Sequence, residues 1–306
     1  MPLPSASAGQ IAYGEYGDST GTLAGRSQAG PQSLPLHLTD FLGQHQTGPA
    51  SVYLTLTGDA DTLSGQASGG DDHLFGAGGT SVLFGDARLM QGQAQGGADV
   101  ITAGGFRIMA FGDAELMSGH AQGGHDDITG SSGQGARAVA VNDLFGDAYA
   151  LAGNAQGGND HLVGGGTFAG TVNRLYGDGY QLSGHAVAGD DVLVGGRNAV
   201  NDFWGDAAVI EGPNVTTGHD TFVLRPDSQA NTIHDFEAGK DLLDMTAFAA
   251  AGIHSFADLA GLIQDRAEGS FLLLGSTPAS GSSPAMQNSL LVLGDHALAA
   301  GDFLFA

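Results

Sequence analysis

The stretch "LFGDAYALAGNAQGGNDHLVGG" (residues 144–165) carries aspartates on two glycine-flanked turns, Asp147 and Asp160. Variants of this stretch occur five more times, so the chain is an array of repeats. The first aspartates of the repeats form one set, Asp59, Asp86, Asp113, Asp147, Asp178 and Asp206, and the second aspartates form another, Asp72, Asp99, Asp126, Asp160, Asp191 and Asp220. The two sets lie 13 residues apart, or 14 in the last repeat, whereas successive repeats begin 27 to 34 residues apart. The segment between the aspartates is therefore fixed, and insertions fall in the return segment.

Each repeat contains the pattern Leu-x-Gly-x-Ala-x-Gly, whose period of two is typical of a β-strand. Such repeats gain a continuous core only when neighbouring coils stack. We therefore predict an all-β fold in which residues 51–224 form a parallel β-solenoid, similar to a β-roll or β-helix, with about six coils of three short strands. Matching positions then form columns along the stack. An aromatic column, which we expect in the core, contains Phe84, Phe111, Phe145, Tyr176 and Trp204. A polar column, which we interpret as an amide ladder, contains Gln66, Gln93, His120, Asn154 and His185.

Two further segments flank the predicted solenoid. Residues 1–50 contain a degenerate repeat from Tyr16, with Gln32 in place of the second aspartate. Residues 225–306 contain less glycine and are predicted to form a small mixed α/β cap, which would cover the unpaired strand edges of the last coil. We expect a helix from Ser255 to about Ala267, because Ser255 and Asp258 have capping-box spacing and Phe256, Leu259 and Ile263 share one helical face. Strands are expected at 271–274 and 290–293, with a Ser/Pro/Gly loop between them at 276–288.

The composition of the chain excludes several classes of function. The chain has 33 acidic and 9 basic residues, a formal net charge of −24, and it should therefore attract cations and repel nucleic acid and anionic membranes. The absence of cysteine excludes disulfides, zinc–thiolate sites and thiol catalysis. No basic, apolar leader opens the sequence and no apolar run is long enough to span a bilayer. If the chain is exported, we expect its signal to lie elsewhere than at the N-terminus.

Stacking places each set of aspartates in a column, and we name the sets the first and second aspartate columns. Neighbouring strands lie about 4.8 Å apart, and two unit charges at that distance repel by roughly 3 kcal/mol at an effective dielectric constant of about 20. Ca²⁺ suits such columns, because it binds six to eight hard oxygen ligands in irregular geometry. The alternative is that the aspartates are solvent-exposed turn residues that bond nearby backbone. His73, His125, His161 and His219 adjoin aspartates, and we interpret them as residues of solvated turns.

A resemblance follows from the second aspartates and their flanking glycines. The segments "GGDDHLFGAGG" (69–79), "GGNDHLVGG" (157–165) and "GDDVLVGG" (189–196) resemble the nonapeptide Gly-Gly-x-Gly-x-Asp-x-apolar-x of RTX, or haemolysin-type, calcium-binding repeats. The resemblance implies Ca²⁺ ligation by the second column and by the carbonyls of glycines that precede it, Gly70, Gly97, Gly124, Gly158 and Gly189. The Gly-Asp-Ala turn lacks the Gly-x-Asp step of the motif, so the first column matches it less closely.

The tail adds to this resemblance. The segment "GHDTFVLRPDSQANTIHDFEAGKDLLDMTAF" (218–248) and the final "GDFLFA" are similar to the region that follows such repeats in proteins exported by type I secretion. That similarity implies an uncleaved C-terminal signal, the type I secretion machinery as a partner and an extracellular or cell-surface location in bacteria. The repeats differ from the family in length, because family coils usually have 18 residues and carry the motif on both edges.

These observations lead us to expect a secreted, calcium-binding structural protein of a surface layer, matrix or adhesive, possessing no catalytic domain and able to form homo-oligomers, filaments or arrays. No His-Glu-x-x-His or Gly-x-Ser-x-Gly motif is present. An alternative is a lyase- or epimerase-like enzyme that acts on extracellular polysaccharide, since parallel β-helices with coils of this length can support such activity. The scarcity of Lys and Arg argues against uronate binding. Ice binding would require a regular threonine column, which the repeats lack.

Overall fold

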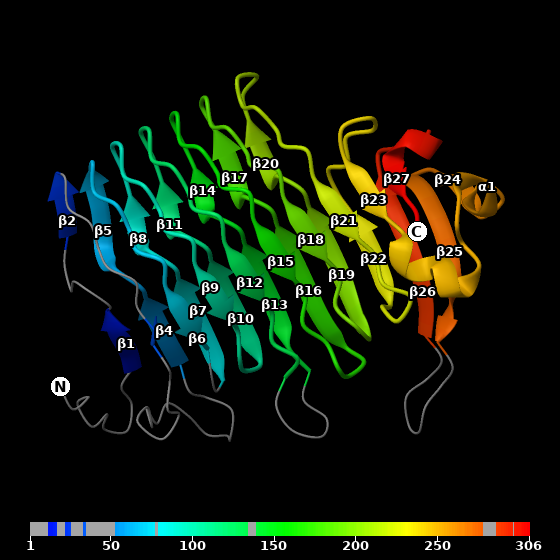
Figure 1. The fold of residues 1–306 in the computed structure, drawn as a ribbon, viewed down its shortest axis with the longest axis horizontal. Helices are drawn as coiled ribbons and strands as arrows, with labels where there is room; N and C mark the ends of the chain where they lie inside the picture. Colours follow the sequence, from blue (N-terminus) through cyan, green and yellow to red (C-terminus); the bar gives the residue numbers. More distant parts are fainter. Residues whose placement is uncertain are drawn as a thin grey trace.

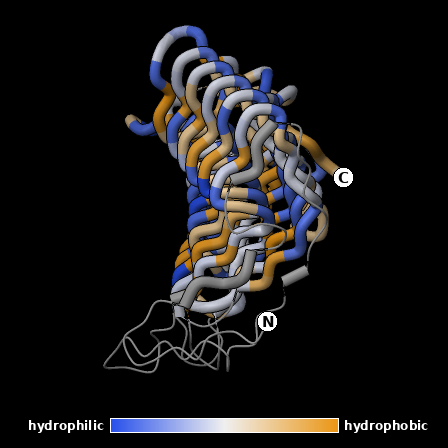
Figure 2. The backbone as a smooth tube through the Cα atoms, turned by 90° about the vertical axis from the view of Figure 1, so that its left-hand side faces the viewer, coloured by the Kyte–Doolittle hydropathy of each residue, from blue (hydrophilic) through white to orange (hydrophobic). Residues whose placement is uncertain are grey.

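The chain winds into a parallel β-solenoid, as predicted (Figure 1). The computed structural model describes residues 12–16, 22–25, 33–34, 53–76, 79–133, 139–277, 286–295 and 297–306. From β4 to β21, every coil contributes one strand to each of three sheets, which gives six complete coils. Viewed from the N-terminal side, the coils lie almost directly behind one another (Figure 2).

The three sheets run the length of the solenoid. The first sheet consists, in spatial order, of β1 (Ala12–Tyr16), β4 (Tyr53–Thr57), β7 (Thr80–Phe84), β10 (Arg107–Phe111), β13 (Val141–Phe145), β16 (Thr171–Tyr176), β19 (Ala199–Trp204), β22 (Ala230–Ile233), β26 (Met286–Leu293), β25 (Gly269–Thr277) and β24 (Ile263–Arg266). The second sheet consists of β2 (Thr22–Gly25), β5 (Ala60–Gly65), β8 (Ala87–Met90), β11 (Ala114–Met117), β14 (Ala148–Leu151), β17 (Gly179–Ser183) and β20 (Ala207–Glu211). The third sheet consists of β27 (Phe303–Leu304), β23 (Leu242–Asp244), β21 (Thr221–Val223), β18 (Val192–Val194), β15 (His161–Val163), β12 (Asp127–Thr129), β9 (Val100–Thr102), β6 (His73–Phe75) and β3 (Ser33–Leu34).

The strands stack in an unshifted register, so matching positions form the columns expected from the sequence. In β10 and β13, for example, Arg107 pairs with Val141 and Phe111 with Phe145. The N-terminal repeat also contributes β1, β2 and β3, one strand to each sheet, although Gln32 lies outside the described residues.

The pattern Leu-x-Gly-x-Ala-x-Gly does not form one continuous strand, which corrects our interpretation. Its central glycines adopt left-handed backbone, with φ between 70° and 80°, at Gly65, Gly92, Gly119, Gly153 and Gly184. This conformation suits glycine because it has no Cβ. The chain turns there and afterwards makes a single bridge per coil, as between Gln95 and Gln122. The second sheet therefore continues into an arc that leads to the third sheet.

Two apolar clusters fill the interior of the coils. The larger lies between the first and third sheets and contains leucine, isoleucine and phenylalanine side chains such as Leu83, Ile101 and Phe222. The smaller lies inside the second sheet and its arc and consists mainly of alanines, with Leu63 and Met90 among them. A buried amide ladder crosses the larger cluster from coil to coil through Asn142, Asn173, Asn201, Asn231 and Asn288. Because Asn288 lies in β26, this ladder joins the C-terminal cap to the solenoid.

The cap is a β-hairpin added to the end of the first sheet, with short helical turns beside it. β26 pairs in parallel with β22, and β25 pairs antiparallel with β26, which confirms the strands expected at 271–274 and 290–293. Most of the loop expected between them lies outside the described residues, and both strands are longer than predicted. The helical turns are η2 (Thr246–Ala251), α1 (Phe256–Leu259) and η3 (Ala300–Asp302). In the described parts of the chain, no helix is long and apolar enough to cross a membrane.

The helix predicted from Ser255 to Ala267 is wrong beyond Leu259. Only α1 is helical, and Ile263–Arg266 forms β24, because this segment pairs antiparallel with β25. Leu259 is buried, and Phe256 and Ile263 pack against the same apolar cluster. The apolar spacing therefore predicted correctly which residues pack against the core, but it predicted the wrong secondary structure. Ser255 Oγ donates to Asp258 Oδ2 rather than capping the helix backbone.

Candidate metal centre

Both aspartate columns lie inside the solenoid, at the boundary between the two apolar clusters. All twelve side chains are buried, with relative exposures of 0 to 3%. The alternative that these aspartates are solvent-exposed turn residues is therefore wrong about solvent exposure, whereas the bonds to backbone that it expected are present. Aspartate is rarely buried fully unless it is paired. The charge of these carboxyl groups must therefore be offset by a partner or by protons.

The first column holds each coil together across its interior. Its carboxylates accept the backbone N–H of a glycine 11 residues later in the same coil, as Asp113 does from Gly124 at 2.9 Å and Asp147 does from Gly158 at 2.7 Å. In the last repeat, Asp206 accepts from Gly218. These bonds link the turn after the first sheet to the turn before the third sheet, so the carboxylates lie between the two turns.

The second column links successive coils. From Asp99 to Asp220, Oδ1 of each aspartate accepts the backbone N–H of the matching aspartate in the preceding coil, as Asp126 does from Asp99 and Asp160 does from Asp126, both at 2.7 Å. The other oxygen of these groups is used differently. Oδ2 is buried without a hydrogen-bond partner in Asp99, Asp126, Asp160, Asp191 and Asp220, and the same holds for Oδ2 of Asp113, Asp147 and Asp178 in the first column. A buried, unpaired carboxylate oxygen is costly.

Backbone carbonyls lie close to these unpaired oxygens. The point where a Cβ on Gly112 would lie is 1.7 Å from the carbonyl oxygen of Gly146 and 2.0 Å from Oδ2 of Asp126. The same arrangement recurs along the stack, where the participating carbonyls belong to Gly85, Gly112, Gly146, Gly177 and Gly205. A side chain would collide with both oxygens at Gly58, Gly85, Gly112, Gly146 and Gly177. The glycines of the Gly-Asp turn therefore bring backbone oxygen next to carboxylate oxygen.

The glycines assigned as carbonyl donors by the sequence lie on the opposite turn. Their carbonyls point along the stack toward the matching glycine of the next coil: the Gly97 oxygen is 1.5 Å from where a Cβ on Gly124 would lie. The Gly-Asp carbonyls, which lie beside the unpaired oxygens, were missed by the sequence reasoning. The sequence did indicate these carbonyls, because a glycine precedes every first-column aspartate.

The second column continues beyond the six repeats, whereas the first column ends at Asp206, because the register places Asp235 opposite Gly205 and Phe236 opposite Asp206. Asp235 accepts the N–H groups of Gly205 and Asp206, and Asp241 accepts the N–H of Asp220 at 3.0 Å, as second-column members do. Neither residue was predicted, because the tail has lost the Gly-Asp-Ala pattern. Its "HDFEAGKD" (234–241) nevertheless contains both aspartates.

Burial dominates the electrostatics of the columns. Desolvation raises the pKa of Asp126 well above its usual range, and the neighbouring carboxylates of Asp160 and Asp99 raise it further. Burial raises the pKa of Asp147 to about 6 and that of Asp220 to about 9. From Asp86 to Asp220, no column aspartate takes part in an ion pair among the described residues. The carboxyl groups therefore need protons or external cations to offset their charge.

The arrangement suits an ion that takes both carboxylate and carbonyl oxygens. Across the described ranges, no three acidic or histidine side chains converge closely enough to hold an ion alone. A cation beside a second-column Oδ2 would therefore depend on the Gly-Asp carbonyls as well. Ca²⁺ accepts such mixed oxygen sets, whereas Mg²⁺ demands near-octahedral geometry and gives up its water reluctantly. The unpaired buried oxygens fit Ca²⁺ by this criterion.

The remaining predicted columns lie away from this boundary. His73, His125, His161 and His219 are exposed, as expected for residues of solvated turns. The polar column is exposed at Gln66 and Gln93, whose side chains form one rung of the expected ladder at 3.0 Å. The aromatic column is largely buried, but it forms a separate cluster on the outer side of the first sheet. Its rings stack along the axis, with centroids 4.7 Å apart for Phe111 and Phe145 and 4.5 Å apart for Tyr176 and Trp204.

Comparisons of the chain with protein-family models, curated proteins and solved structures give no match. The structure itself shows a parallel β-solenoid in which buried aspartates face glycine backbone, an arrangement that is compatible with repeats of the RTX type.

Proposed function

We propose that the chain is a secreted, Ca²⁺-binding structural protein of the RTX type, whose folding is driven by Ca²⁺. The observation that carries the proposal is the pair of buried aspartate columns, the second of which has unpaired Oδ2 atoms beside glycine carbonyls. In this proposal, each ion lies between successive coils and takes Oδ2 of a second-column aspartate together with a Gly-Asp carbonyl. First-column carboxylates would complete the ligand set.

Ion binding would then add to the stability of the fold. The unfolded chain holds no preformed site, so the free energy of binding becomes free energy of folding. Without cations the columns must bind protons or repel one another, and the chain would stay unfolded where Ca²⁺ is scarce. This behaviour suits a protein that crosses a type I secretion channel unfolded and folds outside the cell. The product would be a rigid acidic rod, suited to a surface layer, matrix or adhesive that assembles further.

A Ca²⁺ titration of the metal-stripped, full-length chain against a chromophoric chelator tests the proposal. We expect several ions to bind. The double variant Asp126→Asn/Asp191→Asn should lose ions, whereas Asp127→Asn/Asp190→Asn should retain them. Asp127 and Asp190 adjoin Asp126 and Asp191 in the sequence but are exposed. The control therefore removes the same amount of charge from the surface instead of from the second aspartate column. Absence of Ca²⁺ binding, or equal loss in both double variants, would contradict the proposal.

A further inference from the structure

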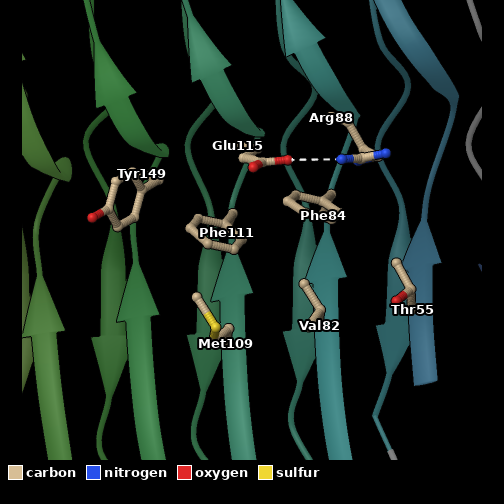
Figure 3. Close-up of a pocket in the computed structure, with 8 residues that line it drawn as sticks. All are labelled: Thr55, Val82, Phe84, Arg88, Met109, Phe111, Glu115 and Tyr149. Carbon is tan, nitrogen blue, oxygen red and sulfur yellow. Dashed lines mark hydrogen bonds and ion pairs between the residues drawn. The ribbon is translucent and has the colours of Figure 1, made fainter. Parts of the chain in front are cut away.

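A groove follows the outer crease between the first and second sheets (Figure 3). Its volume is about 420 Å³, within the range of about 300–1,000 Å³ that is typical of small-molecule sites. The floor is formed by outward-facing side chains of β7 and β10, namely Val82, Phe84, Met109 and Phe111. Neither the aspartate columns nor the two inner clusters include these residues. The groove is therefore a feature separate from the candidate metal centre.

Tyr149 forms the end wall of this groove. Its side chain is large and the residue is 40% exposed. One face of its ring stacks on Tyr180 of the next coil, with centroids 5.1 Å apart and an interplanar angle of 10°. The other face is turned toward the coil that carries Glu115, because Glu115 lies opposite Tyr149 in the register of β11 and β14. A flat ring placed against that face would extend the tyrosine stack above Phe111.

Arg88 and Glu115 form the side wall of the groove and carry charged groups, but they leave the space beside Tyr149 open. The Glu115 carboxylate accepts from Arg88 at 3.1 Å in the coil on its far side, so it points away from Tyr149 (Figure 3). Both side chains are about half exposed. Their hydrogen-bonding groups are therefore open to a ligand that lies along the groove between them and Tyr149.

The ligand must match an apolar floor, an aromatic face and a polar wall together. A pyranose ring has this character, because one face presents C–H groups and its rim carries hydroxyls. An acyl chain would contact the apolar floor but would offer no hydrogen bonds to the exposed groups of Arg88 and Glu115. The formal net charge of −24 disfavours acidic sugars.

We propose that this groove binds a neutral saccharide unit. The sugar stacks its C–H face on Tyr149, donates hydroxyl hydrogen bonds to the Glu115 carboxylate and accepts hydrogen bonds from Arg88. Sugars of a longer chain would continue along the floor toward Thr55, which lines the groove at the end opposite Tyr149 (Figure 3).

Calorimetric titration of the full-length chain in Ca²⁺ tests this proposal. The probes are cellohexaose, laminarihexaose, maltohexaose and chitohexaose, with tri-galacturonate and dodecanoate as the acidic and acyl comparisons. At least one neutral hexaose should bind. Tyr149→Ala should weaken that binding at least tenfold, which equals about 1.4 kcal/mol, whereas Tyr149→Phe should stay within a few-fold of the wild type. Phe75→Ala is the matched control, because Phe75 is equally exposed, at 40%, but lies on the third sheet.

The possible outcomes distinguish a neutral-saccharide site from a site for acyl chains or acidic sugars. Binding of a neutral hexaose that needs the ring at position 149 and not the one at position 75 supports the proposal. Failure of all four neutral probes overturns it, as does saccharide binding that is indifferent to Tyr149→Ala. Tighter binding of dodecanoate or tri-galacturonate would also overturn it and would reassign the groove to acyl chains or acidic sugars. Circular dichroism of each variant verifies that the solenoid is retained.

Discussion

Asp126→Asn should stabilise the ion-free chain and destabilise the Ca²⁺-bound chain. Asp126 is buried, its Oδ1 accepts the N–H of Asp99 at 2.7 Å, and its Oδ2 has no hydrogen-bond partner. Asparagine keeps the shape and the Oδ1 acceptor. It replaces Oδ2 with an N–H donor close to the carbonyl oxygen of Gly146. The substitution therefore replaces a carboxylate oxygen, which is repelled by the neighbouring carbonyl oxygen, with an N–H group that is attracted to it.

The magnitude follows from the neighbouring charges. The carboxylates of Asp160 and Asp99 both raise the pKa of Asp126. At the strand spacing of about 4.8 Å and an effective dielectric constant of about 20, each full charge pair repels by roughly 3 kcal/mol. Proton binding already relieves part of this repulsion, so we expect the free energy of unfolding in chelator to rise by about 1–3 kcal/mol. In Ca²⁺ one ligand is lost, and each tenfold loss of affinity lowers that free energy by about 1.4 kcal/mol.

In EGTA at neutral pH the wild-type chain is expected to be unfolded, so the first effect is measured as the concentration of the osmolyte trimethylamine N-oxide that is needed to fold the chain. Urea unfolding in excess Ca²⁺ measures the second effect. Trp204 is the only tryptophan, and its ring stacks between Tyr176 and His234, so its fluorescence reports on the solenoid. The adjacent change Asp127→Asn is the control, and because Asp127 is exposed we expect it to alter stability by less than about 0.5 kcal/mol in either condition. A change in stability of the same sign in EGTA and in Ca²⁺ for Asp126→Asn would refute the reasoning.

Three further predictions follow from the same geometry. Burial raises the pKa of Asp147 to about 6 and that of Asp220 to about 9, so the ion-free folded chain binds more protons than the unfolded chain. The folded fraction in EGTA, measured by circular dichroism, should therefore fall as pH rises from about 4 to 9, and a fraction that does not change with pH would contradict this. Gly124→Ala places a Cβ 1.5 Å from a backbone oxygen and should cost about 3 kcal/mol or more. Gly261→Ala meets nothing within 4 Å and should change the urea midpoint in Ca²⁺ little, and equal effects would refute the packing argument. Asn201→Ala interrupts the buried amide ladder and should cost at least about 1–3 kcal/mol, measured by urea unfolding in Ca²⁺; an unchanged midpoint would show that the ladder contributes nothing.

Much of the fold could be predicted because the repeats specify it many times over. The constant interval within each aspartate pair, as between Asp86 and Asp99, required a fixed segment, and the stacked coils provide one. The segment 263–266 could not be predicted as a strand from its apolar spacing, because its pairing with β25 overrides local helical preference.

The candidate site was predicted less completely. Both aspartate columns were found, but their burial was not, because Asp beside Gly is typical of exposed turns. Burial follows from bonds across the coil, such as Asp113 to Gly124, that no local pattern encodes. The Gly-Asp carbonyls, the bond of Asp235 to the Gly205 turn and the end of the second column at Asp241 likewise depend on how coils stack.

Sedimentation velocity of the metal-stripped, full-length chain, titrated with Ca²⁺ and in parallel with Mg²⁺, tests the central claim most directly. We expect a slow, expanded species without divalent ions and a compact, faster species as Ca²⁺ fills the aspartate columns, with Mg²⁺ much less effective. A chain that sediments as the same compact species in chelator, Mg²⁺ and Ca²⁺ at neutral pH would show that the buried columns need no calcium, and would contradict the claim.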